Sequence, residues 1–185
     1  MRILLIAIAT LLTLAYPLVV YFGIQRCSPA LFSLFFIALA AIKLQVSQHQ
    51  RDRSLVLTLT AIMAYSIALA LSNSERLLLL YPAFVSFNVA AAFFASLRQD
   101  ESLIERSARA HGKVITPAAK YYTRWLTAVW GCALLLNGGI SLYLALLGAR
   151  TAWALYSGLI SYAWLAALFA GEYAYRRYYM AKHHA

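Results

Sequence analysis

The chain has 185 residues, of which 63% are hydrophobic and 12% are charged, and its mean hydropathy is +0.70. A soluble domain of this length cannot bury so much apolar surface, so the composition excludes a water-soluble globular fold. The net charge of +10 does not indicate a nucleic-acid partner, because the basic residues lie at the ends of apolar runs and not on one exposed face. We therefore expect an all-α, polytopic membrane helical bundle in contact with the lipid bilayer.

Six apolar runs are long enough to cross the hydrocarbon core, which takes about 20 residues at a rise of about 1.5 Å each. The first run is too long for the apolar region of a signal peptide and lacks a cleavage motif, so we expect it to be retained. None of the runs alternates in polarity as a transmembrane β-strand does. The predicted spans are residues 3–24, 30–46, 55–71, 77–97, 125–148 and 153–171.

The basic residues predict the orientation of this bundle. With six spans, the side that holds the N-terminus carries 13 Lys and Arg residues, and the opposite side carries three. The positive-inside rule assigns the richer side to the cytoplasm. We therefore expect six transmembrane helices with both termini inside, an arrangement abbreviated N-in/C-in. The same rule makes the loop 98–124 cytoplasmic.

The loop 98–124, between the fourth and fifth spans, is the only long polar segment in the chain. Its segment Ser102–Glu105 fits a capping box, and Arg109 follows Glu105 at the favourable spacing of four residues. Gly112 suits the end of a helix, and Pro117 suits the start of the next one. The loop is therefore predicted to contain a short interfacial helix.

Six of the sixteen basic residues lie in this loop, together with three of the six acidic residues. Two interpretations of the basic residues remain open. In the first, they bind anionic lipid headgroups, and each residue contributes about 1 kcal/mol to membrane association. In the second, they form a docking surface for an acidic soluble partner. The candidate docking residues are Arg106, Arg109, Lys113, Lys120 and Arg124.

A second set of polar residues lies near the middle of the predicted spans. Asn88 is the twelfth of 21 residues in span 77–97, and Asn137 is the thirteenth of 24 in span 125–148. Because an amide facing lipid is costly, we expect both asparagines to face inward and bond each other. Ser66 and Ser161 lie at a similar depth. The set forms either interhelical bonds of about 0.6 kcal/mol each or a polar pocket.

Other residues in the spans predict packing and anchoring. The pair Gly138-Gly139 permits close approach of a neighbouring helix. Pro82 removes a helical hydrogen bond and favours a kink or a polar spot in its span. Trp125 and Trp153 open the fifth and sixth spans, where aromatic residues anchor a helix at the membrane surface.

Residues suited to catalysis are scarce. Lys43 is the only charge inside a predicted span, and Glu172 lies just beyond the sixth, where a structural ion pair with a neighbour such as Arg124 is expected. A surface acid–base site at His49 and Asp52, with His111 on the same side, is the alternative. There is no phosphate-binding loop and no zinc-ligand spacing. The sequence thus predicts no catalytic residue, no cofactor and no metal.

A pattern of residues, concentrated between positions 81 and 177, resembles a family of small bacterial inner-membrane proteins. These proteins are encoded beside aryl polyene or other fatty-acid-like biosynthesis genes. The resemblance implies a multi-pass protein of the inner membrane in a polyene-lipid pathway, and it implies no mechanism. The residues that carry it are Tyr81-Pro82, Ile104-Glu105-Arg106, Ala108-Arg109, Pro117, Tyr122-Thr123-Arg124, Thr127, Trp130, Asn137, Trp153-Ala154-Leu155-Tyr156, Gly158, Phe169 and Glu172.

Three functions are compatible with these features. The leading hypothesis is a non-catalytic scaffold of an aryl polyene or fatty-acid-like lipid pathway, which docks an acyl carrier protein or another acidic protein on the loop 98–124. The second is a small lipid transporter or flippase that uses the polar residues at mid-membrane. The third is a membrane enzyme acting at the cytoplasmic face through His49 or Glu172. No nucleic-acid partner is expected, and a homo-oligomer is left open.

Overall fold

The computed structural model describes residues 20, 22, 28–34, 36–37 and 53–183. Every secondary-structure element in this part of the chain is helical, which confirms the predicted all-α class. The larger elements are α3 (Arg53–Ser72), α4 (Glu75–Leu97), α5 (Leu103–Ala110), α6 (Pro117–Leu146), α7 (Arg150–Leu155), a π-helical turn η1 (Tyr156–Ile160) and α8 (Ser161–His183).

Three helices are long and apolar enough to cross a membrane: Glu75–Leu97, Pro117–Leu146 and the continuous segment Arg150–Arg177. They coincide with the predicted fourth, fifth and sixth spans and identify the chain as a membrane protein. The apolar stretch Leu59–Ser72 of α3 is shorter and falls within the predicted third span. The first two predicted spans, together with Lys43, His49 and Asp52, lie mostly or wholly outside the described residues.

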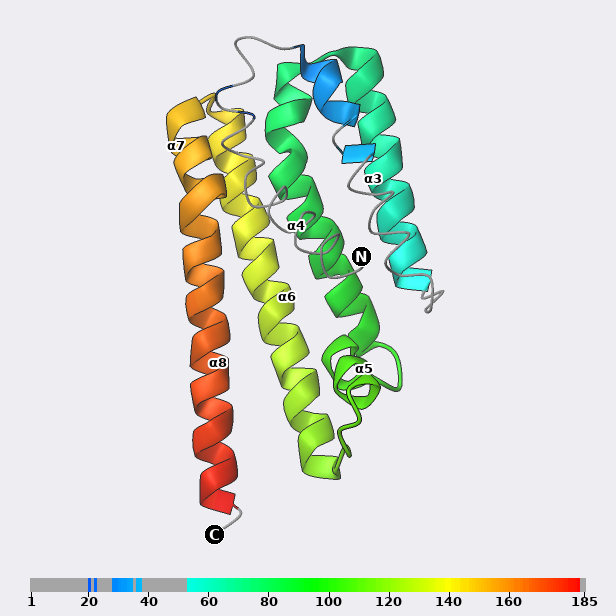
Figure 1. The fold of residues 1–185 in the computed structure, drawn as a ribbon, viewed down its shortest axis with the longest axis vertical. Coiled ribbons are helices and arrows are strands. Elements are labelled where there is room, and N and C mark those ends of the chain that lie inside the picture. The colour runs from blue at the N-terminus through cyan, green and yellow to red at the C-terminus, as the bar shows by residue number, and fades with distance from the viewer. Residues whose placement is uncertain (1–19, 21, 23–27, 35, 38–52, 184–185) are drawn as a thin grey trace, which may run out of the picture.

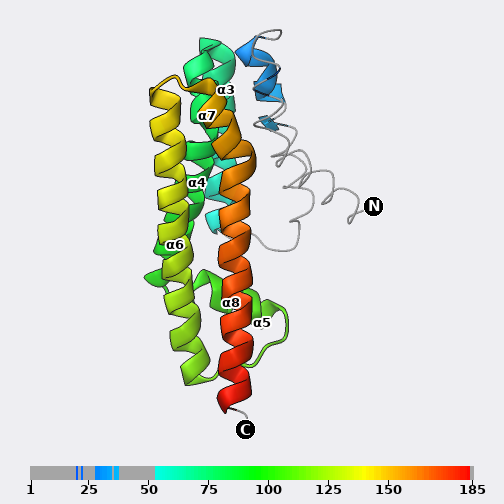
Figure 2. The ribbon, with the colours of Figure 1, turned by 90° about the vertical axis from the view of Figure 1, so that its left-hand side faces the viewer.

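The long helices run side by side along one axis, and α5 lies at one end of the bundle (Figure 1). The turn between α3 and α4 and the turn between α6 and α7 lie at the opposite end. Turning the molecule by 90° shows that α8 follows α6 along most of its length (Figure 2). The fifth helix begins earlier than predicted, so residues 117–124 of the predicted loop belong to α6.

The helices α4 and α6 form the closest helix–helix contact among the described residues. Gly131 and Gly138 lie on the inner face of α6, where added Cβ atoms would stand 2.8 Å from the ring of Phe94 and 2.6 Å from the ring of Phe87. The absence of a side chain therefore lets the phenylalanine rings of α4 lie against the backbone of α6. The packing role predicted for Gly138 is confirmed, whereas Gly139 faces open space.

The end of the bundle away from α5 holds its main apolar core. Trp153 is only 1% exposed, and its indole N–H donates to the Leu79 carbonyl at 2.9 Å. The predicted surface anchor at Trp153 is therefore wrong, because α7 turns this ring into the bundle. Trp125 is 54% exposed, as an anchor at the membrane surface requires. The core comprises Val20, Phe32, Phe36, Leu69, Leu78, Leu79, Trp153 and Ala154.

Two carbonyl groups of α4 near Pro82 accept hydrogen bonds from neighbouring helices. Tyr65 of α3 donates its hydroxyl to the Leu77 carbonyl, and the indole of Trp153 donates to that of Leu79. Both acceptors lie within five residues before Pro82 on α4. Side chains from two neighbouring helices thus bind α4 on either side of Leu78, the residue whose carbonyl Pro82 deprives of its helical donor.

Candidate functional site

The segment Arg98 to Arg124, here called the α5 platform, contains all the predicted docking residues. Its helix begins at Ser102, whose hydroxyl accepts a hydrogen bond from the Glu105 amide at 3.4 Å. This is one half of the predicted capping box. The Glu105 side chain makes no reciprocal bond to the Ser102 amide and turns toward Arg109, four residues later.

The end of α5 follows the sequence signals closely. Gly112 has a φ of +73°, and its amide donates to the Arg109 carbonyl at 2.8 Å. The Lys113 amide donates to the Ala108 carbonyl at 3.1 Å. These two bonds form a Schellman motif, which requires the positive φ that glycine adopts without strain. The predicted helix end at Gly112 is therefore confirmed.

The start of α6 also matches its prediction. Pro117 occupies the first turn, and the Thr116 hydroxyl accepts a hydrogen bond from the Ala119 amide at 3.2 Å. Only the six residues from His111 to Thr116 connect α5 to α6. A short connection between two capped helix ends gives the α5 platform a defined shape.

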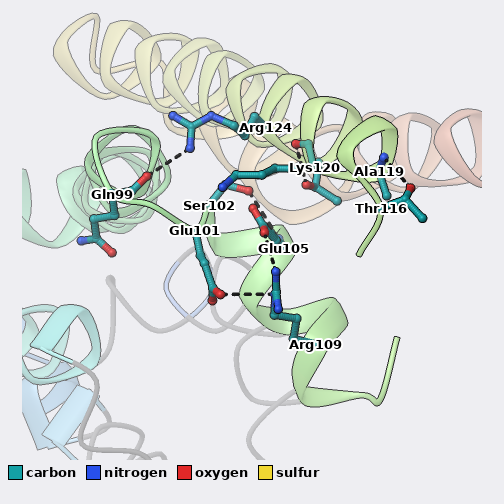
Figure 3. A network of polar contacts seen from close by, with 10 residues as sticks. Gln99, Glu101, Ser102, Glu105, Arg109, Thr116, Ala119, Lys120 and Arg124 are labelled. Carbon is teal, nitrogen blue, oxygen red and sulfur yellow. Dashed lines mark hydrogen bonds and ion pairs between the residues drawn. The ribbon is translucent and has the colours of Figure 1, made fainter. Parts of the chain in front are cut away.

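Two hydrogen-bond systems hold the α5 platform against the long helices, and Figure 3 shows the one that Arg124 makes. The Leu103 amide donates to the Ser96 hydroxyl on α4 at 3.0 Å. The guanidinium of Arg124 donates to the Gln99 carbonyl at 3.0 Å and also to the Leu97 carbonyl. A cation at these carbonyls satisfies the free acceptors at the end of α4 and complements the helix dipole. Arg124 therefore fixes the platform to the bundle.

Arg109 lies between two carboxylates (Figure 3). Its Nε atom is 3.2 Å from Glu101 Oε1, and one of its terminal nitrogens is 3.3 Å from Glu105 Oε1. The Glu105 side chain is fully buried, and its second oxygen has no hydrogen-bond partner among the described residues. The predicted pair of Glu105 and Arg109 is confirmed. With two carboxylates beside it, Arg109 adds little uncompensated positive charge to the surface.

The remaining docking candidates divide into two kinds. Arg106 donates to Gln99 Oε1 at 2.6 Å, so its guanidinium is also held within the platform. Lys113 and Lys120 are exposed, and neither side chain makes a hydrogen bond or ion pair with the described residues. The five predicted residues therefore comprise three arginines that hold the platform together and two lysines that extend from it.

Gln99 is the platform residue that the sequence did not single out. Its side-chain oxygen accepts from Arg106, and its backbone carbonyl accepts from Arg124. Its position immediately after the fourth predicted span, among arginines, was the available signal. An amide there satisfies guanidinium donors without adding charge.

The polar residues inside the bundle are arranged differently from the prediction. Asn137 donates from Nδ2 to the Ser86 hydroxyl at 3.0 Å and accepts from the Tyr156 hydroxyl at 3.1 Å. These three residues, here called the Asn137 layer, join α4, α6 and η1. Asn88 donates at 2.8 Å to the Phe84 carbonyl of its own helix. The predicted bond between Asn88 and Asn137 is therefore wrong.

The two predicted serines also bond within their own segments. Ser66 is buried and donates to the Ile62 carbonyl at 2.8 Å. Ser161 donates from its amide to the Tyr156 carbonyl, five residues back, and from its hydroxyl to the Ser157 carbonyl at 3.2 Å. In a regular α-helix the Ser161 amide would bond Ser157. The Ser161 hydroxyl thus donates to the Ser157 carbonyl, which lacks its usual backbone donor because of the π-helical turn.

Glu172 connects α8 to α6 near the α5 platform. Its Oε1 atom accepts from the Tyr122 hydroxyl at 2.9 Å and lies 3.7 Å from Arg176 Nε. The expected structural ion pair of Glu172 is therefore present, but its partner is Arg176 and not Arg124, which is occupied at the end of α4. His111 is exposed and lies beside the Ser107 carbonyl of α5.

Within the described residues, no group of three or more potential ligands is arranged to hold a metal ion. Comparison with family models, with curated proteins and with solved structures found no match to this chain. The geometry of the α5 platform and of the Asn137 layer therefore carries the functional argument.

Proposed function

We propose that this protein is a non-catalytic docking scaffold in a bacterial inner membrane. Three apolar helices of sufficient length and the asymmetry of 13 basic residues against three support six spans with both termini and the α5 platform in the cytoplasm. The resemblance to proteins encoded beside aryl polyene or fatty-acid-like biosynthesis genes supports a role in such a lipid pathway.

One observation carries the proposal: a polar platform held in shape by its own hydrogen bonds leaves Lys113 and Lys120 exposed, with no side-chain partner among the described residues. The Schellman motif, the Thr116 cap and the Arg124 bonds fix the backbone on both sides of these lysines. A preformed surface loses little conformational entropy when a partner binds. Two ammonium groups on such a surface attract an acidic protein and orient it.

The arrangement revises the role of the arginines. Arg106, Arg109 and Arg124 shape the surface, and the two lysines recognise the partner. The pathway context favours an acyl carrier protein, whose acidic surface complements the lysines. Such an interaction weakens as salt screens the charges, with a screening length of about 8 Å at physiological ionic strength.

The alternatives gain less support from the described residues. A transport path needs a continuous polar layer, yet Asn88, Ser66 and Ser161 each bond within their own segment. An enzyme acting through Glu172 needs a carboxylate free to react, whereas this one is held by Tyr122 and Arg176.

The decisive experiment measures binding of an acyl carrier protein to the scaffold in lipid nanodiscs. The double variant Lys113→Gln/Lys120→Gln is expected to bind about tenfold more weakly, which corresponds to about 1.4 kcal/mol. Arg76→Gln is the matched control, because Arg76 is exposed at the opposite end of the bundle. Equal binding by the double variant and the wild type would refute docking at these lysines.

A further inference from the structure

The helical segment Arg150–Arg177 carries two arginines just beyond its apolar part. The sequence holds no charged residue from 151 to 171, and Arg176 and Arg177 follow soon after that stretch. The segment has 28 residues, which at a rise of about 1.5 Å each give a length of about 42 Å. A bilayer with its headgroup layers is roughly 40–45 Å thick, so the two ends of this segment reach opposite headgroup layers.

Both of these guanidinium groups lie near one aromatic ring, that of Tyr173. The guanidinium carbon of Arg176 is 5.7 Å from the centre of this ring, and that of Arg177 is 5.9 Å from it. The arginines follow Tyr173 by three and four residues, so the three side chains lie on one face of the helix. Cation–π attraction restrains both guanidinium groups without using their N–H donors in hydrogen bonds. This surface of Tyr173, Arg176 and Arg177 is here called the α8 cationic face.

The α8 cationic face retains positive charge. Glu172 is the one acidic residue in the sequence after position 150. Its Oε1 atom lies 3.7 Å from Arg176 Nε and also accepts from the Tyr122 hydroxyl at 2.9 Å. Arg177 is exposed and makes no ion pair with a carboxylate of the described residues. Two cations beside one carboxylate leave a net positive charge at this level.

The arginine at the other end of the same segment is neutralised within the protein. A terminal nitrogen of Arg150 lies 2.6 Å from Glu75 Oε1, at the start of α4. A cation at headgroup level that has no such carboxylate attracts the phosphate of a lipid. The two ends of Arg150–Arg177 therefore differ, and only the Arg177 end presents a cation that an external anion can neutralise.

The surroundings of the α8 cationic face favour a lipid over a soluble protein as the source of that anion. The end of α8 and the start of α6 lie at the same end of the bundle (Figure 1), where the rings of Tyr122 and Tyr175 stack with centres 6.3 Å apart. Tyr121 and Trp125 on α6 are exposed at this end, as are Tyr173 and Tyr175 on α8. Exposed aromatic rings at the end of an apolar span are typical of the headgroup layer, which a soluble partner does not enter.

We propose that the α8 cationic face binds the phosphate of an anionic phospholipid such as phosphatidylglycerol. Arg177 donates to the phosphate oxygens, and Arg176 adds a second guanidinium while it also faces Glu172. The acyl chains lie along the apolar surface of α8, where Phe169, one turn before Tyr173, is 60% exposed. The site does not include the lysines of the α5 platform, so it does not depend on the docking function.

Native mass spectrometry of the detergent-solubilised protein tests this site. Phosphatidylglycerol and phosphatidylcholine with identical acyl chains are titrated separately, and the affinity of the first bound lipid is measured. We expect phosphatidylglycerol to bind about fivefold more tightly, the ratio that corresponds to about 1 kcal/mol for one basic residue at the membrane surface. Equal affinities for the two lipids would overturn the proposal.

Charge variants locate the preference on the helix. Arg177→Gln is expected to weaken phosphatidylglycerol binding about fivefold, whereas Arg176→Gln is expected to weaken it only about twofold, since Glu172 already offsets part of that charge. Arg76→Gln is the matched control, because Arg76 is exposed at the opposite end of the bundle, and it is expected to change nothing. An Arg177→Gln protein with wild-type affinity for phosphatidylglycerol refutes the site.

A ring variant separates the α8 cationic face from general attraction to positive charge. Tyr173→Leu removes the ring but no charge, and it is expected to weaken phosphatidylglycerol binding about threefold. Tyr121→Leu is the control, because no arginine of the described residues lies over that exposed ring. Equal effects of the two changes contradict the proposed geometry.

A protein partner at the same face gives a different result. If Arg177→Gln weakened binding of an acyl carrier protein in phosphatidylcholine nanodiscs and left the phosphatidylglycerol affinity unchanged, the face would belong to the docking surface and the lipid site would be rejected. The lipid site predicts the reverse, with binding of the carrier protein unchanged.

Discussion

The helix α6 has two long contacts, and they are built in different ways. Against α4, glycines at 131 and 138 bring the backbone onto phenylalanine rings, and Asn137 bonds Ser86 across the contact. Against α8, bulky aromatic rings keep the helices apart, and the one interhelical side-chain hydrogen bond described there joins Tyr122 to Glu172. The first contact brings the two backbones together, whereas the second, here called the seam, is made through aromatic side chains.

This difference has a physical origin in side-chain volume. Without a hydrophobic driving force in lipid, helices associate through close packing and hydrogen bonds. On the α4 side, Gly138 permits the close packing and Asn137 forms the hydrogen bond. Large rings such as Trp130 prevent the same closeness on the α8 side. A single chain can therefore combine a pair of helices in close backbone contact with a third that packs through its side chains.

The largest expected effect comes from filling the close contact. Leucine at Gly138 would place its Cβ atom 2.6 Å from the Phe87 ring, so Gly138→Leu is expected to destabilise the protein by about 1–3 kcal/mol. Gly139→Leu is the adjacent control, because nothing lies within 4 Å of its added Cβ atom. Thermal unfolding in detergent measures both. Equal losses would mean that α4 and α6 are not held as described.

A smaller effect is expected at the polar bond within the same contact. In a double-mutant cycle, Asn137→Leu and Ser86→Ala should show a coupling of about 0.6 kcal/mol, the average for membrane proteins. The pair Asn137→Leu and Asn88→Leu should be additive, because Asn88 bonds its own helix. Coupling between the two asparagines would restore the pairing that the sequence predicted.

The smallest effect is expected at the seam. Tyr122→Phe removes one hydroxyl and is expected to cost about 0.5 kcal/mol, the low end for one hydrogen bond, since a neighbouring arginine remains at Glu172. Its readout is faster hydrogen exchange in the last turns of α8, with α4 unchanged. Tyr121→Phe is the control, because that side chain is 77% exposed. No change in exchange would show that other contacts hold the seam.

Local signals in the sequence predicted the platform well. Ser102, Gly112 and Pro117 act on backbone groups within a few residues of themselves, so their effects depend little on the rest of the fold. The i,i+4 pair of Glu105 and Arg109 is local in the same sense. The length and composition of the apolar runs likewise located three of the long helices.

Relations between helices were beyond this kind of inference. Depth in the membrane placed Asn88 and Asn137 at one level, but two residues along a helix turn the side chain by about 200°. Ser86 therefore faces α6 where Asn88 does not. Trp153 stands at a predicted surface position, yet the fold of α7 buries it. The neighbour that each side chain faces depends on the rotation of its helix about the helix axis, and no local sequence pattern encodes that rotation.

The π-helical turn at Tyr156–Ile160 determines how α8, which follows it, is rotated about the helix axis. A helix advances about 100° for each residue, so removing one residue here to restore a regular α-helix would rotate α8 by about that angle. Glu172 would then turn away from Tyr122. The one extra residue of the π-helical turn thus determines which face of α8 lies against α6.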